Sequence, residues 1–493
     1  MTAGGTRSAG VIGAGFGGLA LAIRLQAAGV ATTLFEARDK PGGRAYVYHD
    51  AGFTFDAGPT VITDPDCLRK LWRLTGHDID RDVTLLPVDP FYRLCWEDGT
   101  VFDYADDQDA IERQIAAISP GDVAGYRRFL AYSRAVYREG YEKLGAVPFL
   151  HFSDMIRAAP QLARLQAWRS VHAMVARHIR DERLRQAFSF HTLLVGGNPF
   201  STSAIYALIH ALERKGGVWF AKGGTGALVA GMVRHFQRLG GTLRLNSPVE
   251  RIETEGRRAT AIHAGGGRHA FDVIASNADV VHTYRALLGD AARGDRLAAR
   301  RHSMSLFVVY FGLRGLRPHL RHHMVLFGPR YRGLVDQIFH GNGLAQDFSL
   351  YLHAPSVTDD SLAPPGHSAY YVLAPVPHLG TADPDWESAA PAYRDRILDY
   401  LEARHIPNLR RDLVTLRHFT PLDFKMKLNA HLGSAFSIEP ILTQSAWFRP
   451  HNRDDRLDNL FLVGAGTHPG AGLPGVIGSA EATASLILAP EGP

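Results

Sequence analysis

The sequence predicts an α/β fold whose nucleotide-binding unit is assembled from distant parts of the chain. Three observations predict it. A glycine-rich turn at 13–18 lies between an apolar strand and a helical pattern. A second apolar strand follows and ends in an acid, Glu36, at the spacing typical of a dinucleotide-binding βαβ unit. A third strand, with its own glycine-rich turn and helix start, occupies 459–479, close to the other end of the chain.

The first glycine-rich turn carries the residues that a dinucleotide site requires. Gly13, Gly15 and Gly18 supply the tight turn and the close backbone approach. The first amides of the helix that follows would face a pyrophosphate. Glu36 can accept both hydroxyls of an adenosine ribose and disfavours a 2′-phosphate. The turn and the acid together predict a cofactor site.

The segment after Glu36 narrows the choice of nucleotide. Arg44 follows the glycines Gly42 and Gly43, and a basic side chain after such a flexible pair can swing over a diphosphate. Arg38, on the same segment, is counted with it as a cofactor-binding candidate. The segment resembles the Gly-Gly-Arg segment of FAD-dependent amine oxidases and carotenoid desaturases, and this resemblance implies FAD.

Composition bounds the class of protein. The chain has 493 residues, 46% hydrophobic and 21% charged, which predicts about two to three folded domains with a short flexible tail at 1–9 and little other disorder. The net charge of +5 comes from scattered arginines without a Lys/Arg block, so we expect no nucleic-acid partner. A mildly basic enzyme of this kind could instead sit on anionic lipid.

Cysteine usage and hydropathy indicate the compartment. Cys67 and Cys95 form no Cys-x-x-Cys motif, so we expect no disulfide framework, a reducing cytosol and no metal site. No apolar run approaches the roughly 18 residues of a spanning helix, and the N-terminus carries no secretory signal. The expected location is cytoplasmic, on the periphery of the cell membrane.

The pattern along the chain predicts five segments. Strand signals dominate at first, helical periodicity takes over near residue 109, a βαβ-like pattern with one strand over 242–252 returns after the helices, and alternating apolar runs between about 303 and 380 suggest a second sheet. We therefore predict a nucleotide-binding domain built from 1–108, 215–290 and 456–493, a helical membrane- and substrate-associated subdomain at 109–214, and a mixed-sheet substrate-binding domain at 291–455.

The C-terminal turn is the most specific motif in the sequence. Gly464, Gly466 and Gly472 punctuate an apolar strand, a loop and a helix start. This pattern resembles the C-terminal motif of bacterial-type carotenoid desaturases, and the whole chain resembles the bacterial phytoene desaturases. The likeness includes four further runs, at 58–63, 194–200, 223–228 and 276–279. Val249 and Val476 complete the predicted cofactor-binding residues.

The resemblance implies a fold, a cofactor and a reaction. The fold would be a Rossmann-like, GR2-type FAD-binding domain with the mixed-sheet and helical parts inserted. FAD would take a hydride from an allylic C–C single bond, repeatedly, converting 15-cis-phytoene through phytofluene, zeta-carotene and neurosporene to all-trans-lycopene. The chain shows no second Gly-x-Gly-x-x-Gly with the helix and acid of a separate NAD(P)H-binding unit. We therefore expect the electrons to leave FAD to oxygen or a membrane quinone. Homo-oligomers on the membrane are a further possibility.

Two other functions fit parts of the pattern. One is a related flavin enzyme, either another carotenoid desaturase or isomerase or an amine-oxidase-like oxidase. The other, from a different class, is a non-enzymatic prenyl-lipid chaperone, which would have no need of a bound flavin.

The catalytic candidates are less specific. The resemblance suggests that an acid such as Asp154, with Arg157 three residues later, could face the flavin and receive a proton or steady a cationic intermediate. The alternative is a helix-capping aspartate with an i,i+3 arginine partner. His191 and His468 are weaker candidates for an acid or base.

An amphipathic helix over 162–180 is the predicted membrane contact. Its apolar positions include Leu165, Trp168 and Val175, with several arginines close by. Such a helix could lie in a membrane interface, and core packing with extended arginine side chains predicts the same pattern. An insoluble hydrocarbon substrate favours the interface.

Overall fold

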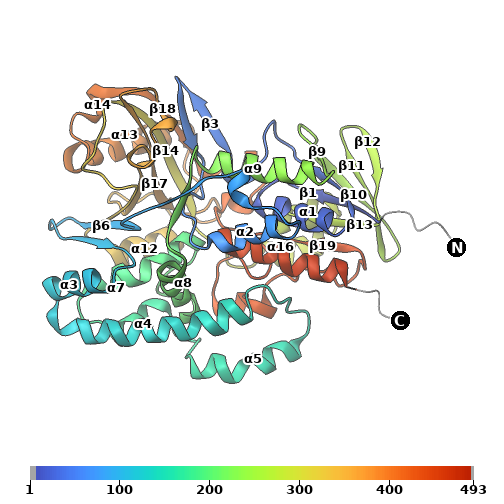
Figure 1. Cartoon of the computed structure of the whole chain (residues 1–493), viewed down its shortest axis with the longest axis horizontal. Coiled ribbons are helices and arrows are strands. Elements are labelled where there is room, and N and C mark those ends of the chain that lie inside the picture. The colour runs from blue at the N-terminus through green and yellow to red at the C-terminus, as the bar shows by residue number, and fades with distance from the viewer. Residues whose placement is uncertain (1–6, 490–493) are drawn as a thin grey trace.

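The computed structural model describes residues 7–489 and shows three regions of structure (Figure 1). A parallel sheet with its helices lies at one end, a larger mixed sheet at the other, and helices run along one side. The predicted flexible tail is wrong for Ser8 and Ala9, which belong to the first strand, while 1–6 lie outside the described residues.

The parallel sheet is the predicted nucleotide-binding unit. Its strand order is β19-β13-β1-β2-β9, so strands from both ends of the chain and from its middle are neighbours. The helices α1, α9 and α16 pack beside it and bury its apolar residues. The bounds are β1 (Ser8–Ile12), β2 (Ala31–Phe35), β9 (Thr242–Arg244), β13 (Val273–Ser276), β19 (Leu460–Leu462), α1 (Phe16–Ala27), α9 (Thr225–Arg238) and α16 (Leu473–Leu488).

The strand predicted over 242–252 is divided between two sheets. Residues 242–252 were expected to form a single strand, but the chain leaves the parallel sheet after β9 because Asn246 adopts a positive φ of 49°. It then begins β10 in a separate antiparallel sheet, which places Val249 close to Glu36. This sheet contains β10 (Val249–Glu255), β11 (Arg258–Ala264) and β12 (Gly267–Ala270).

The larger sheet has the order β18-β14-β17-β16-β15-β6-β7 and is antiparallel except where β15 runs parallel to β6. Both faces of β14 are buried, one against α13 and one against the central core. The bounds are β6 (Tyr92–Trp96), β7 (Val101–Tyr104), β14 (Ser305–Arg314), β15 (His323–Phe327), β16 (Leu350–His353), β17 (His367–Val376), β18 (Leu413–Phe419) and α13 (Trp386–Arg404).

Two strands belong to a different sheet from the one predicted. Residues 92–104 fall in the predicted nucleotide-binding segment 1–108, but β6 pairs with β15 and β7 pairs with β6, so both strands belong to the larger sheet. A hairpin pattern specifies that two strands meet each other, and it does not specify which sheet they join. The exact segment boundaries stay predictions.

Helices dominate the region after β7, as the periodicity predicts. They are α3 (Gln108–Ile118), α4 (Val123–Tyr137), α5 (Phe152–Arg164), α6 (Val171–Ala176), α7 (Glu182–Ser189) and α8 (Leu208–Gly216). The remaining larger helices are α2 (Pro65–Arg73), α11 (Ala291–Ala298), α12 (Tyr331–His340) and α15 (Pro421–Leu428). Two two-stranded antiparallel sheets complete the fold. One is the hairpin of β3 (Val47–Asp50) and β4 (Phe53–Asp56), and the other pairs the distant strands β5 (Leu85–Pro87) and β8 (Trp219–Ala221).

The single helix predicted over 162–180 is wrong. The chain ends α5 at Arg164, turns through Gln166 with a φ of 52°, and begins α6 at Val171. Val171 and Val175 are buried in the central core, whereas Trp168 in the turn is 63% exposed. The apolar periodicity therefore came from a core helix and an exposed turn next to each other. Over 7–489, no helix combines the length and the apolar character needed to cross a membrane.

Candidate functional site

The nucleotide site is organised by the turn between β1 and α1. Gly13 has a φ of 91°, and its amide donates to the Phe35 carbonyl at 2.7 Å, which ties the turn to the end of β2. The N-cap of α1 is Gly15, which brings no capping side chain. The first amides of the helix are thus available to an anion, as a dinucleotide pyrophosphate requires.

Gly18 acts through packing rather than by lining the cavity. A Cβ at this position would lie 2.0 Å from the Gly13 carbonyl oxygen, so only glycine lets α1 start directly against the turn. Gly464 and Gly466 likewise fall outside the described residues that line the cavity. A Cβ would meet Asn277 Oδ1 at 2.3 Å from Gly464 and Val280 Cγ1 at 2.8 Å from Gly466.

Glu36 is held where an adenosine ribose would be recognised. It is 6% exposed, and its carboxylate accepts hydrogen bonds from the Ala14 amide at 2.9 Å and the Arg38 amide at 3.0 Å. Burial raises the pKa of Glu36 above its usual range, and the two amides act in the opposite direction. The carboxylate is fixed against the turn, with Ser247 and Val249 also lining this part of the cavity.

The Gly-Gly-Arg segment lies beside the first glycine turn. The Gly42 amide donates to the Ala14 carbonyl at 2.8 Å, and Gly43 and Arg44 line the cavity. Arg38 also lines it, with its guanidinium 3.6 Å from the centre of the Tyr46 ring. The positions of these residues match the sequence prediction; their roles as ligands stay predictions.

Among the described residues, the buried polar atoms that lack a hydrogen-bond partner include Arg44 Nε and Asp279 Oδ2. Both residues line the same cavity. Burial lowers the pKa of Arg44, and the charge of Asp279 opposes that shift. A buried group without a partner is costly, so a guanidinium and a carboxylate that both reach this space indicate that a polar ligand completes them.

The C-terminal turn delivers a second helix start to the cavity. α16 begins after Gly472, and Gly472 and Val476 both line the cavity. By contrast, the start of α9 is already occupied, because the buried Asp56 carboxylate accepts from the Thr225 and Gly226 amides at 2.9 and 3.2 Å. The positive dipole end of α16 therefore remains available to an electron-rich ring.

Asn277 is a site residue that the sequence reasoning did not single out. It follows β13, its amide donates to the Ile12 carbonyl at 2.8 Å, and its Nδ2 donates to the Gly13 carbonyl at 3.3 Å. It lies against Gly13, Gly17 and Gly464. The Ser-Asn-Ala-Asp run at 276–279 was the available signal, but its role depends on β13 lying next to β1.

The nucleotide site and an apolar extension of it form one continuous cavity of about 600 Å³. Its walls come from the inner face of the larger sheet and from the helical layer. Most of the lining side chains beyond the glycine turns are aliphatic or aromatic, including Leu193, Leu208, Val325, Phe327, Leu334 and Ile338. A long hydrocarbon fits such walls, since they offer dispersion contacts and exclude water.

Asp154 and Arg157 lie together at the start of α5. The Asp154 carboxylate accepts from the His151 amide at 3.1 Å and pairs with the Arg157 guanidinium. Neither residue belongs to the described cavity lining, whereas Met155 next to Asp154 does. These contacts favour the capping interpretation, and the catalytic role of the pair stays a prediction.

The two candidate histidines differ in position. His468 lines the cavity, and burial lowers its pKa to about 4, so its ring is neutral near pH 7. His191 lies in the core with its Nε2 3.0 Å from Glu213 Oε2. Cys67 and Cys95 are both buried and free.

The fold and the site define a class of dinucleotide-dependent flavoproteins. A model of the family described as flavin containing amine oxidoreductase matches residues 16–488. Among solved structures, putrescine oxidase bound to putrescine shares the fold with a TM-score of 0.65 at 16% identity, covering 98% of this chain and 99% of that one. The chain belongs to this family, and its cofactor is FAD.

The relatives in sequence are more specific. The phytoene desaturase (lycopene-forming) of Paracoccus sp. (strain N81106 / MBIC 01143) is 66% identical over 97% of this chain and 96% of its own. That of Pantoea ananas is 65% identical over 97% and 98%. The phytoene desaturase (neurosporene-forming) of Cereibacter sphaeroides is 44% identical over 98% and 94%.

Proposed function

We propose that the protein desaturates 15-cis-phytoene stepwise to all-trans-lycopene, with FAD as the hydride acceptor. The observation that carries the proposal is the 64–66% identity, over nearly the whole chain, to three lycopene-forming phytoene desaturases. The apolar cavity joined to the nucleotide site supports it. Relatives that stop at neurosporene are much less similar, at 43–44%.

The residues of the site fit FAD and its chemistry. The α1 amides and Arg44 would hold the diphosphate, Glu36 the ribose, and the loop before α16 the flavin ring. When bound, FAD would supply the two-electron oxidant, accepting a hydride from an allylic C–H bond of the substrate, and loss of a proton from the adjacent carbon would complete the double bond. The apolar walls would exclude water from the allylic cation that hydride loss leaves on the hydrocarbon. The positive dipole end of α16 would stabilise negative charge on the flavin ring beside it.

We further propose that oxygen or a membrane quinone takes the electrons. The support is the sequence, in which only the glycine turn at 13–18 is followed by both a helix and a strand that ends in an acid. Anaerobic turnover with a soluble quinone, compared with NAD(P)⁺ under the same conditions, tests this. Product formation with NAD(P)⁺ alone would contradict it.

We propose that α5 covers the cavity and docks on the membrane. Every residue of α5 is at least partly exposed, and the helix lies at the outer edge of the helical layer (Figure 1). Met155, Ala158 and Leu162 line the cavity, at positions that share one helix face. Phe152 and Ile156 are 53% and 61% exposed. One side of α5 thus meets the substrate space while apolar side chains project outward.

Charge and neighbouring segments support the same surface. The basic side chain of Arg157 is exposed on α5, and Trp168 adds an exposed aromatic ring in the following turn. Burying the exposed apolar side chains of Phe152, Ile156 and Trp168 in lipid would stabilise the bound state by about 2 kcal/mol per side chain. A hydrocarbon leaving the bilayer could then pass beneath α5 without crossing water.

Pigment formation tests the reaction. Co-expression with enzymes that make phytoene should give a red pigment with the spectrum and chromatographic mobility of lycopene, and the purified protein should be yellow from FAD. Accumulation of neurosporene would correct the number of steps. A colourless protein that leaves phytoene unchanged would favour the chaperone alternative.

Liposome sedimentation tests the docking surface. The double change Phe152→Ser and Ile156→Ser should reduce binding to anionic vesicles by at least about tenfold, with FAD content unchanged. Leu316→Ser is the control, because Leu316 is equally exposed, at 60%, but lies after β14. If both variants sediment like the parent, α5 is not the docking surface.

A further inference from the structure

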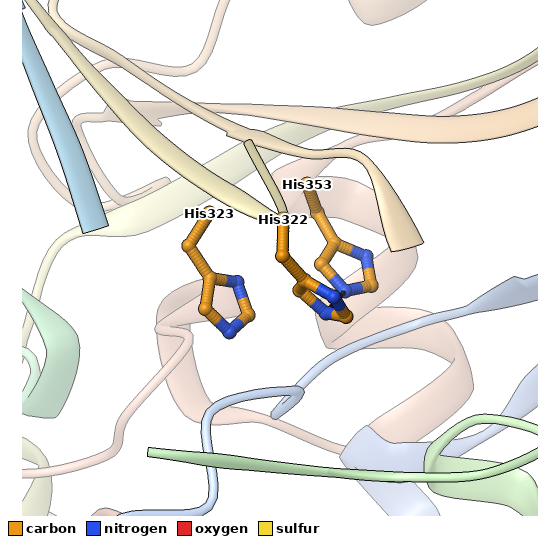
Figure 2. A group of neighbouring side chains, drawn as sticks. All are labelled: His322, His323 and His353. Atoms are coloured by element: carbon orange, nitrogen blue, oxygen red, sulfur yellow. Dashed lines mark hydrogen bonds between the residues drawn. The ribbon is translucent and has the colours of Figure 1, made fainter. Parts of the chain in front are cut away.

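Three buried histidines cluster in the larger sheet behind the cavity wall (Figure 2). His322 immediately precedes β15, His323 begins it, and His353 ends β16. Their exposed fractions are 3%, 0% and 1%. His323 and His353 are paired directly across the antiparallel strands, and one ring nitrogen from each of the three residues lies within 4.8 Å of the others.

Two of the three rings are held by a hydrogen bond to a hydroxyl outside the cluster. His322 Nδ1 lies 2.7 Å from Thr358 Oγ1, and His323 Nδ1 lies 2.6 Å from the Tyr351 hydroxyl. Histidines that bind metals typically use one ring nitrogen for a partner of this kind and the other for the ion. The Nε2 atoms of His322 and His353 face each other at 3.1 Å.

A ring cluster without an ion leaves one atom unsatisfied. His323 Nε2 is buried and has no hydrogen-bond partner anywhere in residues 7–489. Within the described part of the chain, the Nε2 atoms of His322 and His353 have only each other as hydrogen-bond partners. An unsatisfied buried nitrogen destabilises the fold, and a cation would offer the three rings a common partner.

The distances suit a small transition-metal ion. Two nitrogens bound to one tetrahedral zinc are about 3.3 Å apart, because each Zn–N bond is about 2.05 Å. The Nε2 atoms of His322 and His353 are separated by close to this distance, and a ring nitrogen of His323 lies within 4.8 Å of both residues' ligand atoms. Three imidazoles favour zinc and its neighbours in the periodic table over calcium or magnesium.

We propose that His322, His323 and His353 form a binding site for a divalent transition-metal ion of zinc type. The site is distinct from the FAD site and does not depend on the reaction. The carboxylate of Asp359 is buried, and its charge acts on His322, so it provides nearby negative charge for the cation. Because Tyr351 lines the cavity, an ion here would brace β15 and β16 behind the substrate space.

Metal analysis of the tag-free holoenzyme tests the proposal. After equilibrium dialysis against Zn²⁺ and removal of weakly bound ions by gel filtration, elemental analysis should give about one zinc per FAD. Zn²⁺ should also raise the Tm, whereas Mg²⁺ should not. A parent protein with background metal and an unchanged Tm would overturn the proposal, and the trio would then be a hydrogen-bonded structural cluster.

Matched variants locate the ion. His353→Gln and His323→Gln should each lower the zinc content at least tenfold while FAD content stays normal. His210→Gln is the control, since His210 is also a buried histidine, bonded to Tyr104 outside the cluster, and its loss should leave zinc in place. Zinc retained by both cluster variants would overturn the assignment. If a variant fails to fold, the stoichiometry and Tm shift of the parent decide.

Discussion

Replacing Gly18 with alanine tests whether close packing of α1 on the glycine turn sets the FAD site. The added Cβ would lie 2.0 Å from the Gly13 carbonyl oxygen, so the turn or the helix must move by about 1 Å to reach an ordinary contact. That movement costs about 1–3 kcal/mol for overpacking. It also weakens the hydrogen bond from Asn277 to the Gly13 carbonyl, worth about 1 kcal/mol.

The cost should appear as lost FAD affinity. Without FAD the turn can relax and avoid the clash. FAD binding requires the amides to return to their positions around the pyrophosphate, so the strain of about 3 kcal/mol opposes binding and weakens FAD affinity roughly 100-fold. Flavin absorbance per chain and fluorescence titration of FAD into stripped protein measure this. Gly333→Ala in α12 is the control, since its Cβ meets only the end of the Arg330 side chain at 3.4 Å. Parental FAD affinity in Gly18→Ala would refute the reasoning.

Three further predictions follow from the site. Gly15→Val should abolish FAD retention, because a branched side chain would occupy the pyrophosphate position; full flavin occupancy would contradict this. Glu36→Gln should weaken FAD binding by about 1.5–3 kcal/mol near neutral pH. In the parent protein, FAD affinity should fall as the pH is lowered, and the fall should begin above the usual titration range of a glutamate, because burial raises the pKa of Glu36 and protonation removes its charge. FAD titrations at several pH values should show a weaker pH dependence in the Gln variant. For Asp154→Asn, capping predicts lycopene formation within about twofold of the parent, whereas a catalytic carboxylate predicts a loss of about 10²- to 10⁴-fold.

Local sequence determined much of the nucleotide site. Gly13 allows the tight turn, Gly15 keeps the start of α1 free of a side chain, and Gly18 lets α1 pack against the turn. These requirements are visible in three letters and their spacing. Glu36 was equally predictable, since a fixed number of residues separates the turn from the end of the next strand. The alternating apolar runs predicted β14 and β17 for the same reason, because strand period is a local property.

Tertiary structure decided the features that join distant segments. The role of Asn277 arises only because β13 lies beside β1. The histidine cluster arises because β15 and β16 pair in one particular register. The prediction of one helix over 162–180 from apolar periodicity was also wrong, because the apolar residues at helical spacing belong partly to α6 and partly to the exposed turn before it.

Sequence by itself therefore determined the class of fold, the cofactor turn and the family, because each depends on short-range spacing or on likeness along the whole chain. Only the tertiary structure decided which strands share a sheet, which side of α5 meets the cavity and which buried groups lack partners. These features depend on contacts between residues that are far apart in the chain. The free energy of such contacts is set by packing in three dimensions, so they produce no fixed spacing of residues in the sequence.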